Sequence, residues 1–439
     1  MVGSAIGVVV FPGVATQEIM IEQGYGILFM CPGSSDLDDS NLPLCDRLSQ
    51  RIVAHPQRRI SFAEFMAIAL YDPDYGYYAT TASAIGAAGD FYTSPHLDVA
   101  FGELLAEQFA ELWHLLDTPR PFTLVEMGAG QGILAADVLR YLYREHHACF
   151  EAVDYVIVEI SAAMRAEQQR RLKPLADSGQ VRWCGWEEMP PDSVTGCFFS
   201  NELVDAFPVH QVAIAQGQLQ EIYVTLAPEP VAGATPRFVE TLGDLSTPRL
   251  AEYFELVGVD LLSERYPDGY RTEVNLAALD WMQTVADRLH RGYVLTIDYG
   301  YPAQRYYSPT RTTGTLQCYY QHAHHSDPYL HIGRQDLTAH VDFTALERQG
   351  DRCGLDTLGF VPQGLFLMAL GLGDRLAALS HPEPGTEVNL AEILQQRDRL
   401  QALIDPLRLG NFGVLIQGKE LGAAALPKGL QIPTHLGVV

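Results

Sequence analysis

Lysine is almost absent from this chain, which has three lysines among 439 residues. Lysine and arginine together number 29 against 54 acidic residues, so the formal net charge at pH 7 is −25. Proteins bind nucleic acids largely by neutralising phosphates with basic side chains. The charge therefore argues against nucleic-acid binding and favours a neutral small molecule or a basic macromolecule as the partner.

The sequence also lacks the residue spacings of several common sites. Its seven cysteines include no Cys-x-x-Cys pair, and neither a Gly-x-x-x-x-Gly-Lys-Ser/Thr phosphate loop nor a Gly-x-Ser-x-Gly elbow occurs. A cluster of histidines has no cysteines or partner helix at metal-ligand spacing; its members are His322, His324, His325 and His331. These absences predict a protein of a reducing compartment that has no metal site and hydrolyses neither nucleotides nor esters.

Long apolar runs are missing too, because charge or glycine interrupts each apolar segment within about ten residues. Residues 6–14 are apolar, but no lysine or arginine precedes Arg47. The basic residues of a secretory signal or a transit peptide are therefore lacking. We expect a soluble protein with no membrane insertion, no targeting signal and a cytoplasmic location.

The most informative segment contains three alternating glycines, Gly128, Gly130 and Gly132. They connect an apolar strand predicted at 122–127 with an amphipathic helix predicted at 132–147. Glycine permits a sharp turn and a close approach of a ligand to the backbone. A dinucleotide-binding turn, Gly-x-Gly-x-x-Gly, would need glycine at Ile133. The turn fits S-adenosylmethionine better, and a plain structural turn is the alternative.

Strands and helices are predicted to alternate after this turn, which is typical of an α/β protein with a mostly parallel, doubly wound sheet. The further predicted elements of this sheet are strands at 154–160, 181–184, 195–200 and 293–297, and helices at 161–173 and 277–289. Alternating residues at 209–215 and 220–226 predict an inserted antiparallel hairpin. Residues 301–340, rich in tyrosine, histidine and proline, are predicted to be a long loop.

Polar residues follow two of these strands at their carboxyl ends, where ligands of open α/β sheets bind. Glu159 is placed to accept hydrogen bonds from ribose hydroxyls, and the alternative is an exposed strand-end carboxylate. Asn201, Glu202 and Asp205 follow the strand at 195–200. Paired carboxylates there could bind a guanidinium in a bidentate manner, whereas Asn201 and Asp205 could instead cap a turn.

Several ordered blocks are similar to the MidA-type methyltransferases, a family that includes an arginine-methylating assembly factor of mitochondrial complex I. The similarity covers residues 60–420, and besides the glycine turn it includes the segments 71–78, 89–95, 101–105, 201–210, 298–300 and 336–343. The resemblance implies a class I methyltransferase fold with S-adenosyl-L-methionine as its cofactor. It also implies an organisation with an N-terminal extension, a helical cap, a methyltransferase domain with two insertions, and a tail. The expected bounds are 1–50, 51–120, 121–420 with insertions at about 209–275 and 301–340, and 421–439.

The resemblance further implies roles for individual residues. The cofactor-binding set is Gly128, Ala129, Gly130, Gly132, Glu159, Asp90, Thr93 and Ser94, with Glu159 on the ribose and the last three closing over the site. Glu202 and Asp205 then face the methyl acceptor. Asn201, where eukaryotic members of the family carry histidine, completes the candidate catalytic set. The predicted function is methyl transfer to a protein arginine, with a respiratory-complex-type subunit as a candidate substrate. The alternatives are a non-catalytic assembly or scaffold protein, a small-molecule methyltransferase, and a nicotinamide-dependent oxidoreductase, which Ile133 disfavours.

Overall fold

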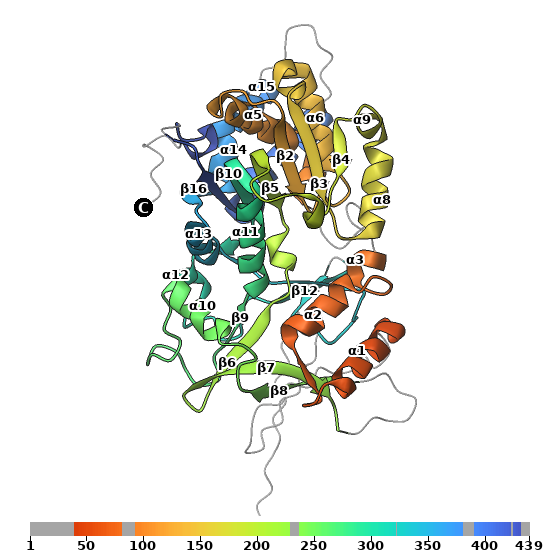
Figure 1. Ribbon diagram of the computed structural model, residues 1–439, viewed down its shortest axis with the longest axis vertical. Helices are drawn as coiled ribbons and strands as arrows, with labels where there is room; N and C mark the ends of the chain where they lie inside the picture. Colours follow the sequence, from red (N-terminus) through yellow and green to blue (C-terminus); the bar gives the residue numbers. More distant parts are fainter. Residues whose placement is uncertain are drawn as a thin grey trace, which may run out of the picture. The chain divides into compact units, whose positions relative to one another are not determined.

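The computed structural model describes residues 39–80, 93–228, 237–321, 323–380, 390–422 and 425–431, almost all of which belong to one compact unit, Ser40–Val439 (Figure 1). Two residues singled out from the sequence, Asp90 and His322, lie outside these ranges. Among the helices within them, none is long and apolar enough to cross a membrane.

A seven-stranded sheet forms the centre of this unit, with strand order β16-β17-β10-β5-β2-β3-β4. Neighbouring strands from β10 to β4 are parallel, and β17 is antiparallel to both of its neighbours. The strands are β2 Phe122–Met127, β3 Val153–Val158, β4 Val181–Trp183, β5 Val194–Asn201, β10 Leu289–Asp298, β16 Asp356–Pro362 and β17 Gly413–Lys419. This architecture confirms the predicted α/β class with a mostly parallel sheet.

Helices cover both faces of the sheet. Successive residues of a strand point to opposite sides, and apolar residues on both sides need to be buried. Leu124 packs in a core with helices α5, α6, α14 and α16, whereas the next residue, Val125, packs in a second core with α11 and α13. The bounds of these helices are α5 Ala100–Leu115, α6 Ile133–Glu145, α11 Leu276–Arg288, α13 Phe343–Arg352, α14 Gln363–Leu370 and α16 Leu390–Ile404 (Figure 1). Burial on both faces explains why these strands are almost wholly apolar.

A second sheet is antiparallel and contains the predicted hairpin. Its turn, Gln216-Gly217, has positive φ at both residues, as a two-residue hairpin turn requires. The strands are β1 Arg59–Ser61, β6 His210–Ala215, β7 Gln218–Leu226, β8 Phe238–Gly243 and β9 Arg271–Val274. Helices α1 Leu42–Ala54 and α2 Phe62–Tyr71 bury their apolar residues in a core with this sheet. The hairpin prediction is thereby confirmed.

The prediction of a long loop at 301–340 is wrong. This segment contains a three-stranded sheet and a short helix, and β11 pairs in parallel with β15. Its elements are β11 Gly300–Tyr301, α12 Ala303–Tyr306, β12 Gln317–Tyr320, β13 Ala323–His325 and β14 Asp336–Thr338, with β15 Val341–Asp342 following. Strands of two to four residues are too short to show a period of two in the sequence, so only their pairing reveals them.

The remaining helices are short or lie at the periphery. They are α3 Tyr77–Thr80, α4 Ser94–Leu97, α7 His147–Phe150, α8 Ala162–Arg171, α9 Lys173–Asp177, α10 Arg249–Val257 and α15 Leu372–Ser380, and the single 3₁₀ turns are Trp186–Glu188, Val204–Ala206, Leu409–Asn411 and Lys428–Leu430. The turn Val204–Ala206 begins three residues after the last residue of β5 and carries one predicted site residue, Asp205.

The cap of α2 allows a test of this part of the fold. The Ser61 hydroxyl accepts a hydrogen bond of 3.1 Å from the backbone N–H of Glu64 at the helix start. Replacing Ser61 by alanine is expected to lower the free energy of unfolding by about 1 kcal/mol. Urea denaturation measures the loss. Ser61→Asp, which restores a capping oxygen, should recover most of it, and equal losses in both variants would contradict this role.

Candidate functional site

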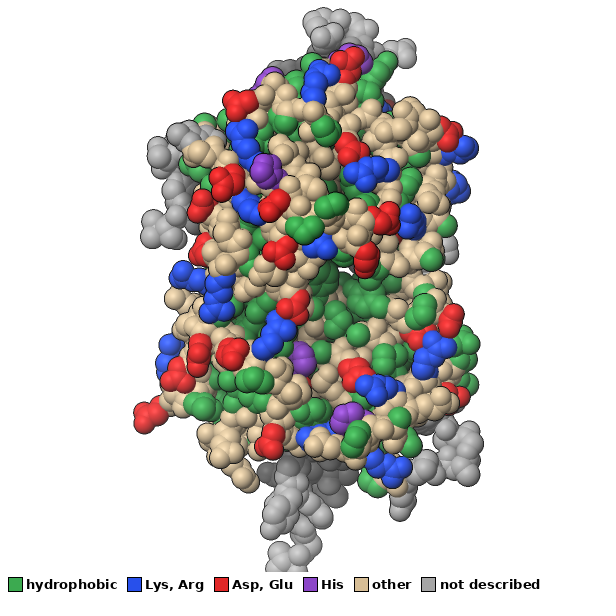
Figure 2. Space-filling view, in the orientation of Figure 1, with side chains coloured by type: hydrophobic (Ala, Val, Ile, Leu, Met, Phe, Trp, Pro, Cys, Tyr) green, Lys and Arg blue, Asp and Glu red, His purple; other side chains and the backbone are tan. Residues whose placement is uncertain are grey.

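The carboxyl ends of β2, β3 and β5 meet around a cavity of about 660 Å³. The space-filling view shows an opening on this face with hydrophobic side chains inside it (Figure 2). The cavity brings together seven of the predicted site residues, which are Thr93, Gly128, Ala129, Gly130, Glu159, Asn201 and Glu202. Its volume suits a ligand the size of a nucleoside with a side chain.

The glycine turn forms one wall of this cavity. Gly128 has φ +70°, and a Cβ built on it would lie 2.7 Å from Leu203 Cδ1. Gly130 has φ +51°, and a Cβ there would meet no atom within 4 Å, so its backbone borders open space. Gly132 is different: it is the N-cap of α6 and does not line the cavity. The first two glycines therefore shape the ligand side of the turn, and Gly132 sets the start of the helix.

Glu159 is held at the cavity by two hydrogen bonds. Its carboxylate accepts from the backbone N–H of Ser161 at 2.8 Å and from Gln168 Nε2 at 2.9 Å. Gln168 Nε2 also lies 2.8 Å from the carbonyl oxygen of Gly130, which ties the end of β3 to the glycine turn. Burial raises the pKa of Glu159 above its usual value. The carboxylate is thus fixed in position before any ligand arrives.

Apolar side chains that the sequence prediction missed form much of the remaining wall. The main ones are Met127, Leu134, Ile160, Trp186 and Trp281. Buried polar atoms at the cavity that make no hydrogen bond within the described residues include Asn201 Oδ1 and Trp281 Nε1. A flat apolar ring with a polar edge fits this lining, as does the adenosine part of S-adenosyl-L-methionine. The glycine turn, the acidic residue at the end of β3 and the aromatic wall therefore fit S-adenosyl-L-methionine.

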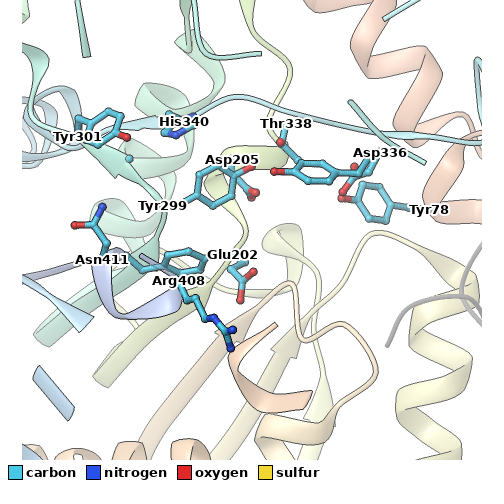
Figure 3. Close-up of a pocket in the computed structure, with 13 residues that line it drawn as sticks. Tyr78, Glu202, Asp205, Tyr299, Tyr301, Asp336, Thr338, His340, Arg408 and Asn411 are labelled. Atoms are coloured by element: carbon cyan, nitrogen blue, oxygen red, sulfur yellow. The ribbon is translucent and has the colours of Figure 1, made fainter. Parts of the chain in front are cut away.

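A second cavity, of about 410 Å³, adjoins the first and shares Tyr78 and Glu202 with it. Asp205 lines this second cavity and not the first. Figure 3 shows Glu202 and Asp205 near its centre, with Tyr78 and Asp336 on one side and Tyr301 and Asn411 on the other. The complete lining is Tyr78, Glu202, Asp205, Tyr299, Gly300, Tyr301, Tyr319, Asp336, Thr338, His340, Arg408, Asn411 and Phe412. We call it the acceptor cavity.

The turn that carries Glu202 and Asp205 is fixed by a third carboxylate, Asp298, at the end of β10. Asp298 Oδ2 accepts hydrogen bonds from the backbone N–H groups of Leu203, Val204 and Asp205, at 3.2, 2.9 and 3.3 Å. Its other oxygen accepts from the backbone of Tyr299 at 2.8 Å. Glu202 adopts φ +54°, an uncommon conformation for a residue other than glycine. Such backbone strain is concentrated at functional sites.

No lysine, arginine or histidine within the described ranges forms an ion pair with Glu202, Asp205 or Asp298. Burial, and then the charge of Asp205, raises the pKa of Glu202 to about 8. The pKa values of Asp205 and Asp298 are also raised, chiefly by burial. Three neighbouring carboxyl groups without a counterion create a site that a cation would stabilise strongly.

The other predicted residues lie close to these two cavities. The Ser94 backbone N–H donates to Glu202 Oε1 at 3.3 Å, and its hydroxyl bonds Gln363 Oε1 at 3.4 Å. Ser94 is fully buried and lines neither cavity. Thr93 lines the first cavity and bonds His96 Nδ1 at 2.6 Å. Ser94 therefore orients Glu202 from behind rather than facing a ligand.

Most of the acceptor cavity was missed from the sequence. Tyr299, Thr338 and His340 each place a buried polar atom there that makes no hydrogen bond of ordinary geometry, as does Asp205 Oδ1. The Tyr299 hydroxyl nevertheless lies close enough to Asp205 to lower its pKa somewhat. The sequence signal for this region is the similarity of the segments 298–300 and 336–343 to a known family, which by itself assigns no role to their side chains.

The raised pKa of Glu202 predicts how stability depends on pH. The native protein keeps a proton on Glu202 up to about pH 8, whereas the unfolded chain loses it near pH 4.5. The free energy of unfolding should therefore fall as pH rises from 5 to 8, by at most about 1.4 kcal/mol per pH unit from this group. Denaturant titrations across this range measure the slope. Glu202→Gln should show a shallower slope, and an unchanged one would contradict the assignment.

Comparison with known proteins agrees with this geometry. A family model described as "Putative S-adenosyl-L-methionine-dependent methyltransferase" matches residues 104–361. The protein arginine methyltransferase NDUFAF7 homolog, mitochondrial, of Drosophila melanogaster is 30% identical over 84% of each chain. Protein arginine methyltransferase NDUFAF7, mitochondrial, of Mus musculus is 31% identical over 73% of this chain and 72% of its own. The relatives named here are mitochondrial, so the predicted cytoplasmic location is wrong: it rested on missing basic residues near the start of the sequence.

Two solved structures share the fold. A "likely methyl transferase" from Burkholderia thailandensis, bound to S-adenosyl-homocysteine, matches with a TM-score of 0.74 and 31% identity over 90% of this chain and 96% of its own. A second structure from the same organism matches with a TM-score of 0.73 and 32% identity, with the same coverage. S-adenosyl-L-methionine is therefore the cofactor, and the chain belongs to the MidA-type family of S-adenosyl-L-methionine-dependent methyltransferases.

Proposed function

We propose that the protein methylates the guanidinium of an arginine residue in a protein substrate. The observation that carries this proposal is the group of three neighbouring carboxyls, the partly buried Glu202 and the buried Asp205 and Asp298, which has no cationic partner among the described residues. A planar cation with several N–H donors suits the oxygens of Glu202 and Asp205. The relatives named protein arginine methyltransferase support the same acceptor.

On the cofactor side, we assign the first cavity to S-adenosyl-L-methionine. Gly128, Ala129 and Gly130 would hold its amino-acid part, and Glu159 would accept hydrogen bonds from its ribose hydroxyls. Thr93 borders the same cavity. When bound, this group supplies a methyl group on a positively charged sulfur. The protein's contribution is mainly to position the acceptor nitrogen, which can account for much of the rate.

On the acceptor side, Glu202 has the central role because it lines both cavities. Asn201 Nδ2 donates to its Oε1 at 2.9 Å, which orients the carboxylate. A guanidinium entering the acceptor cavity would favour ionised Glu202, since an opposite charge lowers the pKa of a carboxyl. The ionised carboxylate can then hold the nitrogen in place and accept the proton that the methylated nitrogen releases.

The experiment uses the purified protein, S-adenosyl-L-methionine carrying a trideuterated methyl group, and a cell lysate. Mass spectrometry of the digested proteins is expected to find the label on arginine side chains. A respiratory-complex subunit is the first purified substrate to test. Glu202→Gln should remove the labelling, and Glu255→Gln, at an exposed position on α10, serves as the matched control.

Two other results would contradict the proposal in different ways. Label found only in small molecules would identify a small-molecule methyltransferase. Binding of S-adenosyl-L-methionine without methyl transfer to any component of the lysate would favour a non-catalytic assembly or scaffold protein. Label on lysine or on a carboxyl group would leave methyl transfer to protein in place but exclude arginine as the acceptor.

A further inference from the structure

Positive charge lies beside one wall of the acceptor cavity, in contrast to the carboxyl groups within it. Tyr301 lines the cavity, and two guanidinium groups lie over its ring. The Cζ atom of Arg305 is 4.2 Å from the ring centroid, and that of Arg311 is 4.9 Å from it. Cation–π contacts of this kind hold arginine side chains in place without neutralising them. The two charges are therefore held against the wall residue Tyr301.

Neither arginine forms an ion pair with an acidic residue in the part of the chain that the structure describes. Arg311 Nη1 instead donates to two backbone carbonyls, those of Arg305 at 2.8 Å and Tyr306 at 2.6 Å. Arg305 is exposed. Both guanidinium groups therefore keep a positive charge that no carboxylate of the described residues neutralises.

A third arginine lines the acceptor cavity directly. Arg408 has a side chain that is 68% exposed, and its Nε lies 3.7 Å from Asp405. In Figure 3 Arg408 and Tyr301 lie on different sides of the two central carboxylates. The acidic interior of the cavity is thus bordered by arginines at more than one point of its rim. We call Arg305, Arg311 and Arg408 the rim arginines.

His340 also belongs to this region and has an unused polar atom. Its ring stacks on Tyr301 at 5.2 Å and packs edge-on against Tyr299 at 5.0 Å. Its Nδ1 is buried and makes no hydrogen bond. Burial and the charges of Arg311 and Arg305 lower the pKa of His340 to about 4, so the ring is neutral at pH 7. A buried ring nitrogen without a partner at a cavity indicates a place for a ligand.

We propose that the rim arginines bind a carboxylate of the substrate protein, so that the preferred acceptor is an arginine with an acidic residue a few positions away. This inference rests on the proposed arginine methylation. An isolated arginine would enter the acidic interior past a cationic rim and be repelled there. A neighbouring aspartate or glutamate would pair with the rim arginines while the guanidinium occupies the interior. The rim arginines thereby discriminate among substrate arginines that the carboxyls of the interior alone would bind equally well.

The test uses synthetic peptides with a single arginine in a glycine and alanine background. Each peptide carries one glutamate, at one of the four positions on either side of the arginine, and is compared with the same peptide carrying glutamine. For at least one position, kcat/KM of the wild-type protein should be about tenfold higher with glutamate, as expected of one charge-assisted pair. Replacing both Arg305 and Arg311 by glutamine should reduce this ratio to near one.

Arg348→Gln is the matched control, because Arg348 is an exposed arginine on α13 that lines neither cavity, and it should keep the full ratio. Replacing Arg305 and Arg311 by lysine should keep much of it. If the glutamine variant does not fold, the wild-type ratio should fall as salt is raised from about 0.05 to 0.5 M. Equal kcat/KM values of the wild-type protein for the glutamate and glutamine peptides would overturn this inference. So would a glutamate-to-glutamine ratio that changes neither in the protein variant with glutamine at 305 and 311 nor with added salt. Methylation of none of the peptides at arginine would count against the proposed function itself.

Discussion

Replacing Glu202 by glutamine is expected to lower the rate of methyl transfer by about 100- to 1000-fold, the usual loss when one aligned electrostatic group is removed from an active site. Glutamine has nearly the same size and can still accept the hydrogen bonds that Glu202 receives from Asn201 and Ser94. It has no negative charge to hold a guanidinium and is a poor acceptor for the released proton. Binding of S-adenosyl-L-methionine should change little, because the glycine turn and Glu159 remain.

Single-turnover rates with labelled cofactor measure the loss, and calorimetric titration measures cofactor affinity separately. At acceptor concentrations well below KM, the wild-type rate should rise with pH as Glu202 of the free enzyme ionises around pH 8, and the glutamine variant should lack this rise. Glu255→Gln is the control for a change of surface charge. A glutamine variant that transfers methyl groups at the wild-type rate would exclude Glu202 from the chemistry.

Replacing Gly128 by valine is expected to weaken binding of S-adenosyl-L-methionine by about 10- to 100-fold, which corresponds to a loss of about 1.4 to 2.8 kcal/mol of binding free energy. A side chain at φ +70° is strained, and its Cβ would lie 2.7 Å from Leu203 Cδ1. Relief of this contact must move either the glycine turn or Leu203. Because Leu203 directly follows Glu202, both walls of the first cavity would be displaced.

Gly179 provides a matched control for the backbone strain. It has φ +77°, but a Cβ there meets nothing within 4 Å, and Gly179 lines neither cavity. Gly179→Val should therefore lose a similar amount of stability from strain while it binds the cofactor normally. Calorimetric titration and thermal melting of both variants separate the two effects. Normal cofactor affinity in Gly128→Val would show that the glycine turn does not contact the ligand.

The alternation of strands and helices around Gly128 could be predicted because each element is long enough to show its period. The predicted strand at 122–127 matches β2 residue for residue, and the helix after it differs only at its ends. The hairpin could be predicted for a similar reason, since it alternates on either side of a glycine turn. The secondary structure of such elements depends on residues close together in the chain, so it can be predicted from a single sequence.

The acceptor cavity could not be predicted in the same way, because residues far apart in the chain form it. Tyr78, Asp205, His340 and Arg408 come from four separate segments, and the Tyr78 hydroxyl bonds Asp336 at 3.0 Å across 258 positions. The role of Asp298 was also missed. In the sequence it is one acidic residue at a strand end, and its function as the acceptor for three backbone N–H groups depends on the turn after a different strand.

The position of Glu202 on both cavities has a thermodynamic consequence. Ligands in the two cavities affect the protonation of one shared group, so their binding free energies are coupled, and the coupling must be the same in either direction. A cation in the acceptor cavity that drives the proton off Glu202 also changes the charge presented to the methyl donor. By the same linkage, the donor changes the affinity for the cation, and proton release in calorimetric titrations in different buffers would report both events. The two cavities thus act as one binding unit, because binding in each of them changes the protonation of Glu202.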